Sequence, residues 1–440
     1  MSNTGSDLTT RSALLRESRR PVLIAVGAAD GTKAIHVGRT IAQRYATEMV
    51  VTSIVEPPPL YSFESNRAML LPWLVEQLFD ERRASVHARL HRHGVLAVDG
   101  AEPRVEVRYG DAADTIADLA RALDARLIVL GIGPHSRRHR ILSGGTAWAA
   151  SRRAPCPILA VGEHAPELPR IAVIATDFSP ESIHAAKVAL TMLADGALVY
   201  LVHAWSRVEA IFPNAVLATF NDRYAARLPV QFARMREALG RTDRFTIETL
   251  ALEGRPADLI LAVADAMRAD LLVAGTHGRG NVERWLLGST SSAVLRGAEC
   301  SVLLAPPPSI SERMELVRSM SDTSTLREPA AWDAELRAFV KRNRDRPTAL
   351  EVEDPKLGAQ VQERGLSLVG ASYDPHDRRV ALMFGDSARR VHFTRNLAHI
   401  RSVVVTSGLR DDRALWIDSD DGGTLVTFLE GTRASPSANA

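Results

Sequence analysis

The sequence has 440 residues, of which 46% are hydrophobic and 24% charged, and its formal net charge is +2 at pH 7. A chain of this length exceeds one hydrophobic core and predicts two to three domains. The nearly balanced charge excludes a strong polyanion partner, so we expect no nucleic-acid binding. No apolar run reaches the roughly 18 residues that span a bilayer. The first residues also lack the apolar core of a secretion signal, so we expect a cytoplasmic protein without a membrane segment.

Residues 1–20 are expected to form a disordered tail, and residues 21–164 a first domain. Within this domain, apolar runs alternate with helical patterns, which predicts a doubly wound, mainly parallel five-stranded sheet of the α/β class. The expected strands are Val22–Val26, Glu48–Val55, Arg104–Tyr109, Leu127–Leu130 and Ile158–Val161.

Residues 169–308 repeat the same order of elements and predict a second five-stranded, Rossmann-like sheet. The expected strands are Ile171–Ala175, Leu198–His203, Phe245–Ala251, Leu271–Ala274 and Ser301–Ala305. Like residues recur 144 positions apart (254 − 110) through some fifty residues, which indicates a tandem duplication. The matching pairs are Gly110 and Gly254, Asp114 and Asp258, Gly131 and Gly275, Gly144 and Gly288, and Cys156 and Cys300.

The two cysteines open equivalent apolar strands of the duplication, which is typical of buried structural thiols, and we expect neither a disulfide nor a cysteine metal site. The polar segment 309–328 is expected to be a linker. Residues 329–432 predict a small α+β domain of unassigned function. Its signals are an amphipathic helix with apolar residues from Trp332 to Val340 and an Asp-Gly-Gly hairpin turn at 420–423. The histidines and acids there show no metal-ligand spacing.

The segment 275–292 carries the clearest binding signal. It follows the apolar run 270–274 and supplies glycines at 275, 278 and 288 and then four consecutive hydroxyl residues at the start of a helical pattern. Glycines after a strand let the backbone approach a ligand, and a helix N-terminus favours phosphate. The alternative is a tight turn with capping hydroxyls. The segment is not a Walker A loop, because no Gly-Lys-Ser/Thr sequence closes it.

The spacing Gly-x2-Gly-x9-Gly-Ser from Gly275 resembles the nucleotide loop of the universal stress protein (UspA-like) family. The sequence from Ile171 to Ser182, with Asp177 after its apolar run, is similar to that family's first strand and turn. The resemblance covers both repeats and implies an ATP site with Mg²⁺ in the second. The positions implied are Ala175, Thr176, Asp177 and Ala204 at the base, Gly275, His277, Gly278 and Arg279 at the ribose and phosphates, and Gly288, Ser289 and Thr290 at the β- and γ-phosphates.

The first repeat lacks these features. Gly27 stands where the second repeat has Asp177, Pro134 replaces Gly278, and Gly145 replaces Ser289. Proline offers no N–H to a phosphate. The basic cluster 137–140 could attract an anion electrostatically, but we expect it to be a solvated basic loop. We therefore expect the first repeat to keep the fold and bind nucleotide poorly or not at all.

The sequence predicts a regulatory or stress-response protein that binds ATP with little or no turnover, since it offers no nucleophile, base and orienting group in one set. Two alternatives stay open. One is a nucleotide-independent interaction scaffold. The other is an enzyme, either a slow ATPase or autophosphorylating enzyme in which His277 accepts a proton, or an adenylating or ATP-hydrolysing enzyme completed by the C-terminal domain. The family resemblance implies that the apolar edge strands Ile158–Val161 and Ser301–Ala305 pair, giving an intramolecular pseudo-dimer. A homo-oligomer stays open, and no protein partner is indicated.

Overall fold

The computed structural model describes residues 20–27, 31–57, 72–95, 102–131, 145–205, 222, 224–276, 289–309, 312–313, 315–316, 319, 324–326, 329–354, 358–386, 391–407, 412–420 and 422–428. These residues form two compact units, one built mainly from the chain up to Pro306 and one mainly from Pro307 onward. The tail 1–19 and the basic cluster 137–140 lie outside the described residues. None of the described helices is long and apolar enough to cross a membrane.

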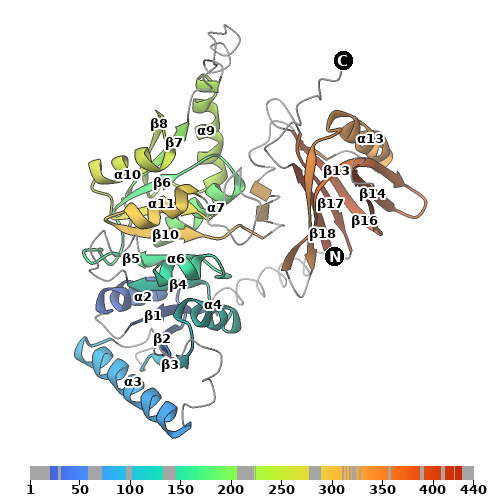
Figure 1. The fold of residues 1–440 in the computed structure, drawn as a ribbon. Helices are drawn as coiled ribbons and strands as arrows, with labels where there is room; N and C mark the ends of the chain where they lie inside the picture. Colours follow the sequence, from blue (N-terminus) through green and yellow to red (C-terminus); the bar gives the residue numbers. More distant parts are fainter. Residues whose placement is uncertain are drawn as a thin grey trace, which may run out of the picture. The chain divides into compact units, whose positions relative to one another are not determined.

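The first unit contains the two duplicated halves, each an α/β fold with parallel strands, as the sequence predicts (Figure 1). The first half has the strands β1 (Val22–Ala25), β2 (Met49–Val55), β3 (Arg104–Tyr109), β4 (Leu127–Gly131) and β5 (Ile158–Val161). Its described helices are α2 (Thr32–Arg44), α3 (Pro72–Arg92), α4 (Ala112–Ala122) and α6 (Thr146–Ser151).

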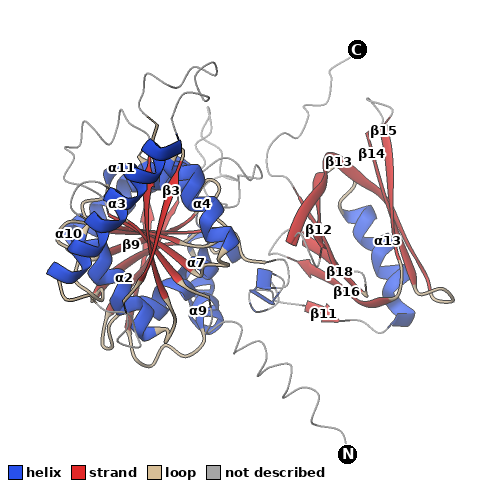
Figure 2. Ribbon diagram, turned by 90° about the horizontal axis from the view of Figure 1, so that it is seen from below, coloured by secondary structure: helices blue, strands red, loops and turns tan. Residues whose placement is uncertain are grey.

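The second half repeats this order. Its strands are β6 (Ile171–Ala175), β7 (Leu198–Trp205), β8 (Thr246–Glu253), β9 (Leu271–Gly275) and β10 (Ser301–Ala305). Its described helices are α7 (Pro180–Met192), α9 (Leu228–Leu239), α10 (Pro256–Ala266) and α11 (Ser289–Gly297). Helices lie on both faces of the strands (Figure 2). The strands β1, β5 and β10 are buried along their whole length, and their sequences are nearly continuous apolar runs.

The two five-stranded halves join into one ten-stranded sheet, in the order β3-β2-β1-β4-β5-β10-β9-β6-β7-β8. The junction is antiparallel between β5 and β10, with Val302 opposite Ala160 and Leu304 opposite Ile158. The buried Ser301 hydroxyl also accepts a hydrogen bond from the Gly162 N–H at 3.1 Å. The apolar edges that each half would otherwise expose therefore cover each other.

Helices reinforce this junction. Arg44, at the end of α2, donates from Nε to the Thr191 carbonyl oxygen of α7 at 2.9 Å. The neighbouring Tyr45 hydroxyl lies 2.6 Å from Thr191 Oγ1. The core cluster of the second half also includes Ala160 of β5, with the half-buried Trp148 of α6 packed against it. The two halves thus share one hydrophobic core at their boundary.

The second unit is an antiparallel sheet with one described α-helix, in agreement with the expected α+β class. The strand order is β11-β16-β17-β18-β12-β13-β14-β15. Its elements are β11 (Ser324–Leu326), the 3₁₀ turn η3 (Pro329–Ala331), α13 (Trp332–Arg342), β12 (Pro347–Asp354), β13 (Gly358–Asp374), β14 (Arg379–Asp386), β15 (Val391–Leu397), β16 (Ile400–Ser407), β17 (Asp412–Ser419) and β18 (Gly422–Phe428).

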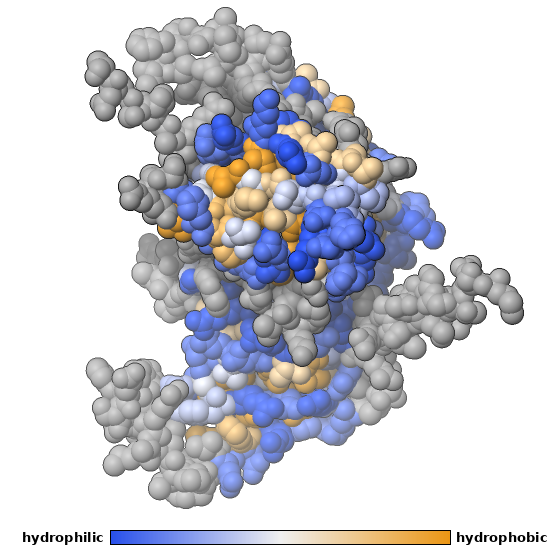
Figure 3. Space-filling view, turned by 90° about the vertical axis from the view of Figure 1, so that its right-hand side faces the viewer, coloured by the Kyte–Doolittle hydropathy of each residue, from blue (hydrophilic) through white to orange (hydrophobic). Residues whose placement is uncertain are grey.

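The amphipathic helix expected from the sequence is α13, and its buried residues Trp332, Leu336 and Phe339 belong to the core cluster of this sheet. The hairpin at 420–423 is also present, with Ser419 opposite Gly422. Large exposed apolar residues of the sheet are Val369, Met383 and Val391, on the adjacent strands β13, β14 and β15. Figure 3 shows one face of the molecule, on which a patch of hydrophobic residues is bordered by hydrophilic residues.

The expected linker 309–328 is partly wrong. Ser324–Leu326 form β11 and pair with β16, and Leu316 is buried. Arg313 also forms an ion pair with Glu351 of β12 at 3.1 Å, with both side chains mostly buried. A three-residue strand is too short to show an alternating pattern, so the polar composition of this segment hides its contribution to the second unit.

Candidate functional site

The candidate site lies at the carboxyl ends of three adjacent parallel strands in the second repeat. Strand β6 pairs with β7 on one side and with β9 on the other. The next strand along the chain, β7, therefore pairs with one edge of β6, and the later strand β9 pairs with its other edge. Such a switch point leaves a crevice outside the strand ends, where ligands bind in open α/β sheets. The predicted residues after β6 and β9 lie at this switch point.

The turn that follows β6 is held by a chain of short-range hydrogen bonds. Thr176 Oγ1 accepts the Phe178 N–H at 2.9 Å. Asp177 Oδ1 accepts the Ser179 N–H at 3.0 Å and the Ser179 hydroxyl at 2.5 Å. Ser179 is in turn the N-cap of α7, where its Oγ accepts the Ser182 N–H at 3.2 Å. The Asp177 carboxylate is thereby fixed in the half-buried turn at the strand end.

A strained residue locks the same turn. Phe178 has φ of +60°, in the left-handed region that bulky residues rarely adopt. Its buried ring packs against His203 at 4.7 Å and Phe232 at 5.0 Å between ring centroids. Such strain costs on the order of 1–3 kcal/mol and persists where surrounding packing determines the conformation, often at functional sites. The aromatic packing therefore sets the direction of the Asp177 turn.

His203 connects this turn to the end of β7. Its Nδ1 lies 2.7 Å from the Thr176 carbonyl oxygen, and its Nε2 lies 2.8 Å from the Tyr224 hydroxyl. A carbonyl oxygen only accepts, so Nδ1 carries a proton and donates it to Thr176. The Tyr224 ring also packs against Trp205 at 5.4 Å. This network supports the backbone at Ala204, which is half-buried next to His203.

The strand β9 and the helix α11 lie on the other side of the switch point. Gly275 ends β9, and its carbonyl oxygen accepts the Ser291 hydroxyl of α11 at 2.6 Å. The Thr276 N–H donates to the Ala305 carbonyl oxygen at 2.8 Å. Helix α11 begins with the exposed Ser289 and the half-buried Thr290. The first N–H groups of a helix have no intrahelical acceptor and favour anions.

Seven of the eleven predicted site residues are thus brought to one edge of the sheet. Those at the ends of their strands or in the turn after β6, or at the start of α11, are Ala175, Thr176, Asp177, Ala204, Gly275, Ser289 and Thr290. Four predicted positions, His277, Gly278, Arg279 and Gly288, lie outside the described residues, so their placement stays a prediction.

Three residues of the site were not predicted from the sequence. Ser179 could have been found, because Ser-Pro-Glu-Ser before a helix is a capping signal. Phe178 gives no signal, since its positive φ depends on tertiary packing. Tyr224 is far from His203 in the sequence, and its position along the chain does not indicate that it lies at the end of β7. Sequence spacing therefore indicates candidate ligand-contact residues more readily than the residues that position them.

The first repeat differs at the equivalent turn. Gly27 is exposed after β1, and its carbonyl oxygen accepts a hydrogen bond from Arg89 of α3 at 3.4 Å. No carboxylate stands at this position. Helix α6 has six residues, with Gly145 as an N-cap that makes no side-chain bond, whereas α11 has nine. The loop with Pro134 lies outside the described residues.

Both cysteines are free thiols. Burial raises the pKa of Cys156 to about 12 and that of Cys300 to about 11. Cys156 is buried, and Cys300 is half-buried. Thiols of this kind stay protonated and unreactive at neutral pH, in agreement with the structural role predicted for them.

Comparison with known proteins identifies the family. The model of the universal stress protein family matches this chain twice, at residues 18–162 and 169–306. The chain belongs to the universal stress protein family. A universal stress protein of Mycobacterium tuberculosis is 28% identical over 245 residues, which are 53% of this chain and 79% of the relative. Another, from Thermus aquaticus, is 37% identical over 134 residues, which are 30% of this chain and 95% of the relative.

Solved structures of the family were also found by comparison of folds. The crystal structure of a universal stress protein from Archaeoglobus fulgidus covers 66% of this chain and 97% of its own, at 15% identity and a TM-score of 0.45. A universal stress protein in complex with cAMP covers 32% of this chain and 99% of its own, at 26% identity and a TM-score of 0.24. The two family matches end before the second unit, so that unit has no assigned family.

Proposed function

We propose that the second repeat of this universal stress protein binds an adenine nucleotide, ATP with Mg²⁺, as a regulatory ligand in a cytoplasmic stress response. The observation that carries the proposal is the fixed Asp177 carboxylate at the switch point between β6 and β9. A carboxylate accepts hydrogen bonds from the amino group of a base or from ribose hydroxyls. The half-buried Ala175 and Ala204 supply apolar surface on the adjacent strand ends.

The start of α11 is the proposed phosphate side. Its first N–H groups and its dipole favour negative charge, and the Ser289 and Thr290 hydroxyls lie in the same turn. The Ser291 bond to Gly275 fixes this helix start relative to β9. A divalent cation such as Mg²⁺ would accompany the phosphates, because Mg²⁺ is commonly bound through substrate phosphate oxygens. The residues of Gly275–Gly288 would complete the site.

Calorimetric titration tests this proposal. The full-length protein is titrated with ATP and Mg²⁺, with AMP, and in parallel with cAMP. We expect about one ATP site per chain. Gly278→Pro should abolish it, whereas the matched change Pro134→Ala in the first repeat should leave it intact. Two equivalent sites, or ATP binding that survives Gly278→Pro, would contradict the asymmetric assignment, and no binding would favour the scaffold alternative.

Two further variants separate the base side from the phosphate side. Asp177→Ala should weaken the binding of ATP and of AMP alike, because the carboxylate is assigned to the nucleoside. Ser289→Ala should lower the affinity for ATP by several-fold and leave the affinity for AMP nearly unchanged. If Ser289→Ala weakens both nucleotides equally, the assignment of α11 to the β- and γ-phosphates is wrong.

The two repeats are proposed to act as one intramolecular pseudo-dimer. The antiparallel pairing of β5 with β10 and the shared core at the junction support this proposal. Hydrogen exchange tests it, since amides of Ile158–Val161 and Ser301–Ala305 should be as protected as those of β4 and β9. Rapid exchange of both strands would indicate that the halves separate in solution.

A further inference from the structure

A second cluster of ligand-type side chains lies in the first repeat, away from the proposed nucleotide site. His87 and His91 are four residues apart on α3. In a helix with 1.5 Å rise per residue, this spacing stacks two side chains on one face, about 6 Å apart along the axis. Neighbouring histidines at this spacing are a common way for a helix to bind a metal ion.

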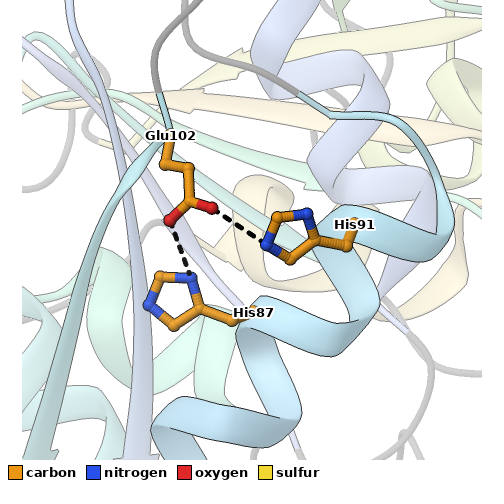
Figure 4. Close-up of side chains that lie close together, drawn as sticks. All are labelled: His87, His91 and Glu102. Atoms are coloured by element: carbon orange, nitrogen blue, oxygen red, sulfur yellow. Dashed lines mark ion pairs between the residues drawn. The ribbon is translucent and has the colours of Figure 1, made fainter.

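The third member comes from a different part of the chain. Glu102 lies two residues before β3, and α3 packs against β3. One carboxylate oxygen, Oε1, is 2.9 Å from His91 Nε2, and the other, Oε2, is 3.8 Å from His87 Nδ1. The carboxylate therefore lies between the two rings, and all three side chains point toward a common centre (Figure 4).

The spacing of the donor atoms suits a small metal ion. Each residue offers one ligand atom, and these atoms lie within 4.8 Å of one another. In a tetrahedral site with bonds of 2.0–2.1 Å, ligand atoms are separated by about 3.3 Å. The observed distances of 2.9 and 3.8 Å fall on either side of that value. Small side-chain rotations would therefore place the three donors around one ion.

We propose that His87, His91 and Glu102 form a binding site for a divalent transition-metal ion, with Zn²⁺ as the ion that this donor set fits best. Two imidazoles and one carboxylate are a ligand set that Zn²⁺ uses when a fourth position is left to water. Imidazole nitrogen suits Zn²⁺, Cu²⁺ and Ni²⁺, whereas Mg²⁺ and Ca²⁺ prefer oxygen ligands throughout. The site is thus chemically distinct from one that holds Mg²⁺ with phosphates.

Nearby cations are paired with other acids. Arg104, two residues after Glu102, forms an ion pair with Glu106 at 2.6 Å, and Arg108 pairs with the same carboxylate at 2.9 Å. Arg83, one turn before His87, pairs with Asp80 at 3.1 Å. These pairs leave the carboxylate of Glu102 directed at the two histidines. Its negative charge would partly offset the charge of the ion.

Exposure makes this an open site. The side chains of His91 and Glu102 are 62% and 58% exposed, and that of His87 is 32% exposed. Solvent, or a donor atom from another molecule, can therefore take the remaining coordination position. The ion would link the end of α3 to the start of β3, which is the outermost strand of the first half of the sheet.

Among its described residues, the second repeat does not carry the two histidines at the equivalent positions. The positive-φ glycines that follow the two long helices, Gly94 and Gly240, align the repeats at an offset of 146 (240 − 94). At this offset, Ala233 and Glu237 stand where the first repeat has the two histidines. The proposed metal site is therefore a feature of the repeat that has lost the nucleotide signature.

The test is a metal titration of the full-length protein after treatment with a chelator. Zn²⁺ is added in the calorimeter, and Co²⁺ serves as a spectroscopic probe of tetrahedral coordination. Loss of an outer-shell partner typically lowers metal affinity 10–100-fold, so loss of a direct ligand should lower it at least as much. We expect one Zn²⁺ per chain, with at least about a tenfold loss in His91→Ala and in Glu102→Gln. Mg²⁺ should not compete.

His93→Ala is the matched control, because His93 lies two residues from His91 but faces Thr32, with its Nε2 3.3 Å from Thr32 Oγ1. This variant should bind Zn²⁺ as the unchanged protein does. Circular dichroism checks that each variant is folded. Absence of saturable Zn²⁺ binding, or unchanged affinity in the folded His91→Ala and Glu102→Gln variants, would overturn the proposal. The nucleotide titrations above are independent of this result.

Discussion

Replacing Ser301 with alanine removes a hydroxyl that connects the two repeats at their shared strand pair. The Ser301 side chain is almost fully buried, and its Oγ accepts the Gly162 N–H at 3.1 Å. Alanine keeps the backbone of β10 and nearly the same volume. The substitution therefore leaves the strand pairing in place and takes away the acceptor of a buried donor.

The expected loss of stability follows from this geometry. A buried polar group left without its partner lowers the free energy of unfolding by about 1–3 kcal/mol, and we take about 2 kcal/mol for a neutral backbone N–H. For a large domain, 1 kcal/mol lowers the melting temperature by roughly 2 °C. The first unit of the Ser301→Ala protein should therefore melt roughly 4 °C below the unchanged protein.

Differential scanning calorimetry measures this shift, and Ser53→Ala provides the control. The buried Ser53 hydroxyl donates to the Val26 carbonyl oxygen at 2.9 Å, inside the first repeat. Its loss leaves an acceptor unpaired, which proteins tolerate better than an unpaired buried N–H. We expect a smaller shift, of roughly 2 °C. A Ser301→Ala protein that melts within 1 °C of the unchanged protein, or no lower than Ser53→Ala, would refute the reasoning.

Three further outcomes are expected. Burial raises the pKa of Cys156 to about 12 and that of Cys300 to about 11, so a thiol reagent at pH 8 should label both slowly in the native protein and rapidly in urea. The Tyr373 N–H, which Asp333 accepts at 3.0 Å, holds the pKa of that carboxyl below its usual value. Its stabilisation is therefore present above about pH 4 and is lost as pH falls through the lowered pKa, so the melting temperatures of the unchanged and Asp333→Asn proteins should converge in acid. ATP hydrolysis should be far slower than a typical turnover of about 10 per second, and His277→Ala should affect it little, while brisk turnover lost in that variant would favour the enzyme alternative.

The sequence was sufficient to place most of the elements in the first unit. Parallel strands buried on both faces are continuous apolar runs, so Ile171–Ala175 and Ser301–Ala305 are found with the bounds that the structure has. Helix α7 begins at Pro180, directly after its N-cap Ser179. Strand pairing in the second unit could not be predicted. There β12 pairs with β18, far along the chain, and local patterns contain no information about such partners.

The candidate site also has a part that the sequence predicts and a part that it does not. Asp177 follows β6 and Gly275 ends β9, and strand ends can be predicted from the sequence. The aromatic contacts that support the turn cannot be predicted, because Phe178, His203 and Tyr224 meet only after β6 and β7 pair. The metal cluster shows the same limit, since His87 and His91 are spaced for one helix face, while the approach of Glu102 depends on the packing of α3.

The covalent connection between the repeats changes what each copy is free to become. Two separate, identical subunits joined by a twofold axis must carry identical sites, because any substitution appears in both. In the structure β5 pairs with β10 of the same molecule, and a pairing of this kind does not depend on protein concentration. One half can then lose a carboxylate, as at Gly27, without removing it from the other half at Asp177. Duplication followed by fusion thus lets a symmetric architecture hold unequal functions.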